Sequence, residues 1–300
     1  MIPLFDLHCD TFSELYNNNF SLKNSPLHIS LDKAKSFSPY IQVCSVWSDC
    51  RLSDEDAFFN YCEVIDFLKS LGIKTKKSSK NFSNLSFILG VEDARILNYS
   101  PDRLELLYND GVRVLTLNWA GNSCIGGGWD TSSPLTAFGR AVVEECARLG
   151  IIIDISHSSL SVQNEVISLA KKLGFVPIFS HSNSFSVCNH RRNLCDEIFR
   201  EIVLLNGLVG ISLAPSHLES AKNANLFSIL KHIDYYFSLG GENCVALGCD
   251  FDGVSALPSG VTSVADLDKL YSLLDKEYGT DLANKVFFKN AYKYFTKKLS

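Results

Sequence analysis

Short apolar runs recur along the whole chain and alternate with longer segments in which apolar and polar positions are mixed. The runs are four to six residues long, rich in Val, Ile, Leu and Phe, and nearly continuous in apolar character. This pattern is typical of strands that are buried on both faces of a parallel sheet. Eight such strands are predicted, at 3–7, 41–46, 87–91, 113–117, 151–155, 176–179, 208–213 and 245–248.

The segments between these runs carry apolar residues at three- and four-residue spacing, which predicts helices with one buried face. Six helices are predicted, at 57–71, 101–109, 135–149, 161–173, 196–206 and 226–239. Glycine follows four of them shortly before the next strand, a position where helices commonly end. These four residues are Gly111, Gly150, Gly174 and Gly207.

Strands and helices therefore alternate along a chain of 300 residues. Eight strand–helix units in a chain of this length predict a single (β/α)8 TIM-like barrel domain that spans residues 1–300. A doubly wound open sheet is the alternative, but no Gly-x-Gly-x-x-Gly follows any predicted strand. No linker or low-complexity segment divides the chain, and the Ser-, Asn- and Lys-rich stretch 74–84 is expected to be a surface excursion.

The composition is that of an ordinary globular protein, with 46% hydrophobic and 20% charged residues. A net charge of −5 gives no electrostatic reason to expect nucleic acid or an anionic membrane as a partner. The chain shows no secretory signal pattern and no apolar run of membrane-spanning length. We therefore expect a cytoplasmic protein whose ten cysteines, which form no Cys-x-x-Cys pair, are reduced and mostly structural.

Titratable residues gather where the predicted strands end. His8 and Asp10 follow the first strand, and because side chains alternate along an extended chain, the two point to the same side. In a barrel, residues just past the strands converge at one mouth. The other acids and histidines at strand ends are Glu92, His157, His181, Asp250 and Asp252.

Each of these residues has an ordinary explanation by itself, such as a helix-start acid, a hydrogen-bonded rim histidine or a turn aspartate. Their common position at the carboxyl ends of strands is not expected by chance and predicts a metal site. Five ligands exceed one four-coordinate site, so two ions bridged by the carboxylate of Glu92 are predicted. His8 and Asp10 would complete one site, and His157 and His181 the other.

A basic element, residues 190–193, follows the strand that carries His181. One interpretation is a solvated surface patch. The other is a clamp in which a guanidinium binds a substrate carboxylate at two points. His28, His217 and His232 have no acidic strand-end partner in the sequence, and no chemistry is assigned to them.

Several of these motifs resemble those of the zinc-dependent membrane (renal) dipeptidases and their microbial relatives. They occur in the order found in that family and span the chain from Asp6 to Gly253. The matching segments are Asp6-Leu7-His8-Cys9-Asp10, Gly90-Val91-Glu92, Asp154-Ile155-Ser156-His157, Phe179-Ser180-His181-Ser182, His190-x-Arg192-Asn193-Leu194 and Asp250-Phe251-Asp252-Gly253.

The resemblance implies a metal-dependent hydrolase of TIM-like barrel fold, with two Zn²⁺ per chain, that cleaves dipeptides bearing a free C-terminal carboxylate. It also implies that His8, Asp10 and Glu92 hold one zinc ion, and that Glu92, His157 and His181 hold the other.

By the same resemblance, Arg192 would bind the dipeptide carboxylate. Asp250 would carry a proton from a water or hydroxide bridging the two metals to the departing amine. The animal enzymes have a substrate-contacting histidine after the fourth strand; this chain has none there, and Asn118 is the expected substitute. The secretion signal and lipid-anchor tail of those enzymes are also missing, which again favours a soluble cytoplasmic enzyme. Barrels of this kind commonly form homodimers.

Two other functions remain compatible with the sequence. A binuclear site of this kind would also suit hydrolysis of a cyclic amide, a lactam or an N-acyl amino acid, because barrel folds host many hydrolases. A non-catalytic zinc- or peptide-binding barrel would require a broken ligand set, whereas every predicted ligand and Asp250 are present.

Overall fold

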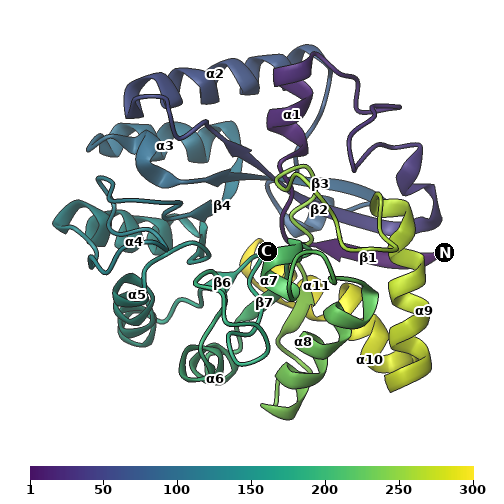
Figure 1. The fold of residues 1–300 in the computed structure, drawn as a ribbon. Helices are drawn as coiled ribbons and strands as arrows, with labels where there is room; N and C mark the ends of the chain where they lie inside the picture. The colour runs from purple at the N-terminus through teal and green to yellow at the C-terminus, as the bar shows by residue number, and fades with distance from the viewer.

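The computed structural model describes residues 1–300 and contains a closed barrel of eight parallel strands. The strands follow one another around the barrel in chain order, and helices surround them (Figure 1). Their bounds are β1 Ile2–Asp6, β2 Phe37–Trp47, β3 Leu85–Glu92, β4 Val112–Thr116, β5 Ile152–Asp154, β6 Ile178–Phe179, β7 Leu208–Ile211 and β8 Val245–Leu247. The predicted TIM-like (β/α)8 barrel is confirmed, and each predicted strand overlaps an observed one.

Six strands differ in length from their predictions, and a proline lies at the altered end of two of them, β6 and β2. β6 begins at Ile178 rather than at residue 176, because Pro177 has no N–H group to give to the ladder. β2 begins four residues earlier than predicted and includes Pro39. This proline is accommodated because the β1–β2 register shifts between Ile2 and Leu4, opposite that part of β2.

All six predicted helices are present, with ends that differ by a few residues from the predictions. They are α2 Asp54–Ser70, α3 Pro101–Asp110, α4 Ala137–Leu149, α5 Leu160–Leu173, α6 Asp196–Leu204 and α8 Leu226–Ser238. Five further helices were not predicted: α1 Thr11–Asn18, α7 Pro215–Leu218, α9 Leu267–Tyr278, α10 Thr280–Asn284 and α11 Asn290–Lys298. Short 3₁₀ turns lie at Lys33–Ser36, Ser79–Asn81, Ala94–Leu97 and Val264–Asp266, and a π-helical turn at Lys285–Lys289.

Three of the four predicted helix-ending glycines have that role, and the fourth does not. Gly111, Gly150 and Gly174 all end their helices in the left-handed conformation. After α6, however, Asn206 takes the left-handed conformation with a φ of 56°. Gly207 is needed there for a different reason. A Cβ atom on it would lie 2.7 Å from the carbonyl oxygen of Pro177, just before β6.

The barrel interior is closed at the end where the strands begin. Phe5 of β1 packs inside the barrel against Phe295 of α11, with ring centroids 4.8 Å apart. Asn290 and Tyr294 of α11 donate hydrogen bonds to carbonyl groups at the start of β8 and just before β6. Figure 1 shows α11 near the middle of the ring of strands. With that end filled, the barrel opens only at the carboxyl ends of the strands.

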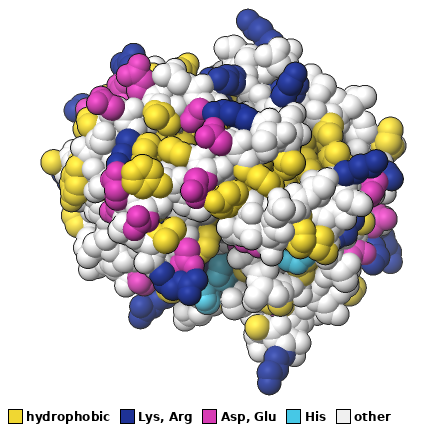
Figure 2. Space-filling view, turned by 90° about the horizontal axis from the view of Figure 1, so that it is seen from above, with side chains coloured by type: hydrophobic (Ala, Val, Ile, Leu, Met, Phe, Trp, Pro, Cys, Tyr) yellow, Lys and Arg dark blue, Asp and Glu magenta, His cyan; other side chains and the backbone are white.

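The surface of the molecule is mixed in character. Figure 2 shows acidic, basic and apolar side chains interspersed over one face, without a large area of one charge sign. None of the helices combines the length and the apolar character needed to cross a membrane.

His232 in α8, to which the sequence assigned no chemistry, has a structural role. The ring is fully buried; Ser184 N donates to its Nδ1 at 3.0 Å, and its Nε2 pairs with Leu218 O at 2.9 Å. Burial lowers the pKa of His232 to about 4 from an ordinary 6.5. The folded state therefore binds this proton less readily than the unfolded state does.

From this shift we expect His232 to contribute to acid sensitivity. Its stabilising contribution is complete above pH 6.5 and is lost as the pH falls from about 6.5 to 4. The difference in free energy of unfolding between wild type and His232→Gln should therefore shrink by up to about 3 kcal/mol over that range. Urea titrations of both proteins at several pH values would measure it. A difference that stays constant with pH would contradict the assignment.

Candidate metal centre and its cavity

The ends of β1 and β8 are joined by backbone hydrogen bonds, and this junction positions two predicted ligands, His8 and Asp10, together with Asp250. Asp250 N donates to His8 O at 3.1 Å, and Asp10 N donates to Phe251 O at 2.9 Å. Beneath the junction, the buried Asp6 carboxylate accepts one backbone N–H from the segment after each strand. His8, Asp10 and Asp250 therefore lie on backbone segments that are bonded to one another.

Glu92, His157 and His181 come from the ends of β3, β5 and β6, and their side chains converge. His157 Nε2 lies 2.9 Å from Glu92 Oε1, and His181 Nε2 lies 3.5 Å from the same oxygen. The two histidine Nε2 atoms are 2.7 Å apart. These three residues form one compact group of potential metal ligands.

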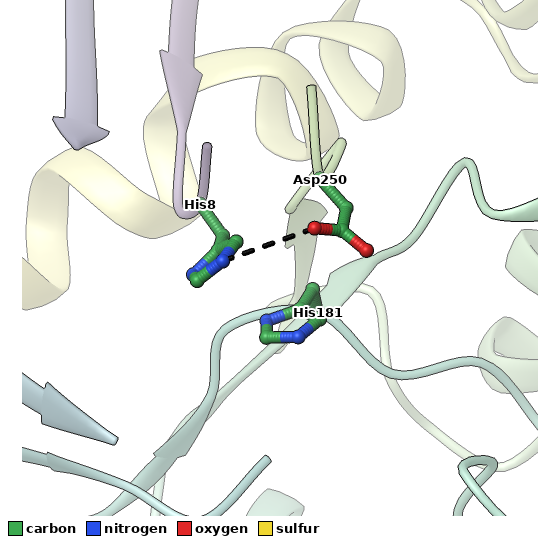
Figure 3. Close-up of side chains that lie close together, drawn as sticks. All are labelled: His8, His181 and Asp250. Atoms are coloured by element: carbon green, nitrogen blue, oxygen red, sulfur yellow. Dashed lines mark ion pairs between the residues drawn. The ribbon is translucent and has the colours of Figure 1, made fainter. Parts of the chain in front are cut away.

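A second group shares Glu92 with the first. His8 Nε2 lies 3.6 Å from Asp10 Oδ2 and 3.6 Å from Glu92 Oε2. Asp250 Oδ1 lies 3.8 Å from the same histidine nitrogen, and Figure 3 shows it pointing toward His8, with His181 close by. The structure thus brings all five predicted ligands together, with Glu92 between the two groups. Asp250 lies at their edge, close enough to form a third group with His8 and His181.

Burial shifts the pKa values of four of these side chains. Burial, followed by the charge of Asp10, raises the pKa of Glu92 to about 7, and burial raises the pKa of Asp250 to about 6. The pKa values of His157 and His181 lie well below the ordinary range, mainly because both rings are buried. The two imidazoles are therefore neutral, which is the form of histidine that binds metals.

Two buried polar atoms of this cluster have no hydrogen-bond partner, which is evidence that the site binds a metal ion. His8 Nε2 and Asp10 Oδ1 have no hydrogen-bond partner within the protein. Buried polar atoms are normally paired, and closely packed carboxylates need a compensating positive charge. A divalent cation would satisfy both requirements, and imidazole nitrogens with carboxylate oxygens are ligands that zinc accepts. The residues present therefore fit a buried metal site.

The ligand cluster opens into a cavity of about 680 Å³ at the mouth of the barrel. Three ligands, Asp10, Glu92 and His157, line it, whereas His8 and His181 lie behind them. One wall of the cavity is aromatic and contains all three tryptophans of the chain, which no sequence motif had indicated. They are Trp47, Trp119 and Trp129, with Trp47 and Trp119 in contact and Trp119 stacked on His157.

Arg192 lines the same cavity although it is 93% buried. Its Nε and Nη2 atoms are buried and have no hydrogen-bond partner within the protein. Burial lowers its pKa to about 10, so the guanidinium is still charged at neutral pH. Arg192 therefore places a positive charge with unpartnered donors beside the cavity, and the interpretation of residues 190–193 as a solvated patch does not hold for it.

Asn118 does not line the cavity. It is buried after β4, where its Oδ1 accepts a hydrogen bond from Ser158 Oγ at 3.1 Å. Its Nδ2 is buried and unpartnered. The expected contact between Asn118 and a substrate stays a prediction.

The expectation that His28 has no acidic strand-end partner is wrong, and His217, to which no chemistry was assigned, lies in the cavity. His28 Nδ1 accepts a hydrogen bond from Asp252 N and lies 3.4 Å from Asp252 Oδ1, so an acidic strand-end residue does pair with it. Asp252 also accepts from Thr11, and it belongs to none of the three groups of potential metal ligands. His217 lines the cavity beside His190, with ring centroids 4.5 Å apart. Its position after β7 was the signal in the sequence that could have identified His217 as a cavity residue.

Residues 1–298 match the family model described as membrane dipeptidase (peptidase family M19). Among curated relatives, the Aspergillus oryzae dipeptidase aclJ is 32% identical over 208 residues, covering 66% of this chain and 48% of that protein. Mouse dipeptidase 3 is 28% identical over 290 residues, covering 88% of this chain and 57% of that protein. The chain thus spans about half the length of these two relatives.

Solved structures of the same fold match nearly the whole chain. Dipeptidase AC, a metallopeptidase of family M19, superposes with a TM-score of 0.91 at 24% identity, covering 99% of each chain. A metallopeptidase from Rhodobacter sphaeroides, solved with a phosphinate mimic of the dipeptide L-Ala-D-Ala, superposes with a TM-score of 0.89 at 23% identity. That match covers 100% of this chain and 99% of the other. At these identities, the comparison shows a shared fold.

Proposed function

The chain belongs to the membrane dipeptidase family, peptidase family M19, and from this premise we propose that it is a zinc-dependent dipeptidase. Its substrates would be dipeptides with a free C-terminal carboxylate. One observation carries the proposal: the buried ligand cluster opens into the same cavity as Arg192, whose guanidinium has unpartnered donors. A hydrolytic centre and an anion-binding group in one cavity suit a short peptide that ends in a carboxylate.

We assign the metal ligands as the sequence predicted them. His8, Asp10 and Glu92 would hold one zinc ion, and Glu92, His157 and His181 the other. Two zinc ions bound there would generate hydroxide from a water between them at neutral pH and polarise the scissile carbonyl. The proposed catalytic barrel domain includes all of residues 1–300, because α11 near the C-terminus closes the barrel that β1 begins.

The protein side chains would bind the substrate and move the proton. Arg192 would hold the substrate carboxylate through its free N–H groups, which fixes the distance between that end and the cluster. Asp250, next to His8 and facing the cavity, would accept a proton from the attacking water and give it to the leaving amine. The tryptophan wall would exclude water around the bound dipeptide. Asn118 is proposed as the substitute for the substrate-contacting histidine of the animal enzymes.

Metal analysis paired with activity assays would test this function. We expect two zinc equivalents per chain and cleavage of a small dipeptide panel that stops after chelation and returns with added zinc. Elemental analysis and product detection by chromatography are the measurements. The panel should include cyclic dipeptides, lactams and N-acyl amino acids as matched alternatives.

The metal content and the substrates that are cleaved decide together between the proposed function and its alternatives. Two metals without dipeptide cleavage would refute the dipeptidase assignment, and cleavage of an alternative substrate would replace it. Failure to bind metal even after reloading would refute the metal centre itself. Binding of dipeptides without turnover in the zinc-loaded protein would favour a peptide-binding barrel.

A further inference from the structure

A buried chain of hydrogen bonds lies behind His181, on the side away from the ligand cluster. His181 Nδ1 is 2.7 Å from Ser180 Oγ, and Ser180 Oγ is 2.6 Å from Asp154 Oδ2. All three residues are at most 1% exposed. The proposed function uses His181 as a ligand but assigns nothing to Ser180 or Asp154.

We propose that Asp154 and Ser180 are positioning residues that fix the tautomer and ring orientation of His181, so that its Nε2 carries the lone pair for the metal. This inference rests on the proposed metal centre and adds to it the two residues that prepare one ligand.

The direction of the hydrogen bonds follows from the groups that surround Asp154. Its Oδ1 accepts the backbone N–H groups of Ser156 and Ser180, at 3.0 and 2.9 Å. Its Oδ2 accepts the hydroxyl of Thr116 at 2.6 Å as well as that of Ser180. With two backbone N–H groups donating to Oδ1, the other oxygen of the carboxylate accepts from the two hydroxyls, so the Ser180 hydroxyl proton points to Asp154.

The single proton of the Ser180 hydroxyl determines the tautomer of His181. With that proton directed to Asp154, Ser180 Oγ can only accept from His181 Nδ1. Nδ1 therefore carries the imidazole proton, and Nε2 is left as the ligand atom. His181 Nε2 does face the cluster, 3.5 Å from Glu92 Oε1. A metal-binding histidine whose other nitrogen donates to a fixed acceptor is oriented and made more basic.

The other two histidines of the cluster lack this arrangement. His8 Nδ1 has only the Ser45 hydroxyl nearby, at a longer 3.4 Å. His157 Nδ1 is buried and has no hydrogen-bond partner. His181 is therefore the imidazole ligand whose tautomer the fold fixes before a metal binds.

The test compares metal affinity in two variants that each remove one hydroxyl next to Asp154 Oδ2. Ser180→Ala removes the acceptor of His181, and we expect the affinity for Zn²⁺ to fall by about 10- to 100-fold. Thr116→Val is the matched control: it removes a donor to the same oxygen but leaves the contact between Ser180 and His181. Its affinity should stay close to that of wild type. Competition of apo protein with a chromophoric chelator for Zn²⁺ measures both.

A second measurement does not depend on the variants folding. ¹⁵N chemical shifts of labelled histidine in the apo wild-type protein distinguish a ring protonated at Nδ1 from one protonated at Nε2. We expect His181 to be protonated at Nδ1. Protonation at Nε2, or equal losses of affinity in Ser180→Ala and Thr116→Val, would overturn the inference. Neither readout uses a substrate, so a protein that binds metal but cleaves no dipeptide would refute only the proposed function.

Discussion

Asp250→Asn is expected to lower kcat for dipeptides by about 10²- to 10⁴-fold, the usual range for loss of a general acid–base group. Asparagine keeps the shape of the side chain but cannot take up or release a proton at neutral pH. The side chain lies at the edge of the ligand cluster, with Oδ1 3.8 Å from His8 Nε2. Steady-state kinetics and metal content of the purified variant are the measurements, and we expect two metal equivalents to remain.

Metal content is essential in this experiment because Asp250 also lies within ligand distance of His8 and His181. Loss of one metal together with activity would identify Asp250 as a ligand, and near-normal turnover would remove it from the mechanism. Asp252→Asn is the matched control. This neighbouring acid binds Thr11 and His28 outside the cluster, and its variant should retain most of the turnover.

Arg192→Ala is expected to lower kcat/KM for dipeptides with a free carboxylate by about 10²-fold or more, equivalent to about 3 kcal/mol. The guanidinium is buried and charged, and its Nε and Nη2 have no protein partner, so a bound carboxylate is the group that would pair with them. The loss should be much smaller for the corresponding dipeptide amides, which carry no negative charge. Parallel kinetics on acid and amide forms would measure the difference.

The neighbouring Arg191 provides the control for this prediction, because it is exposed whereas Arg192 is buried. Arg191→Ala should leave kcat/KM for the acid substrates close to wild type. Equal losses on acids and amides in Arg192→Ala would show that Arg192 acts on folding or on the metal site rather than on the substrate carboxylate.

Local patterns in the sequence predicted the barrel and the grouping of the candidate ligands because both depend on short-range order. A parallel strand buried on two faces must be apolar throughout, so each of β1 to β8 left a visible run. Residues just past such strands lie at one mouth, so His8, Asp10, Glu92, His157 and His181 could be grouped without coordinates. Arg192 was singled out within residues 190–193 only by the family resemblance.

Helices whose role depends on a distant surface were not predicted. α11 carries polar residues over much of its length, and its apolar face is explained only by the open end of the barrel that it fills. α1 begins directly after Asp10, so its short pattern merged with that of the ligand segment. Periodicity cannot show which end of a barrel a helix will cover.

The sequence by itself determined the order of the strands, the residues at their ends and the family to which the motifs point. Only the tertiary structure decided how side chains from different strands share a space. Trp47, Trp119 and Trp129 form one wall although they are far apart in sequence. Likewise, Asp154 reaches His181 only because β5 and β6 pair in the register that brings Ser180 between them. Such contacts depend on strand pairing and packing, which no local pattern encodes.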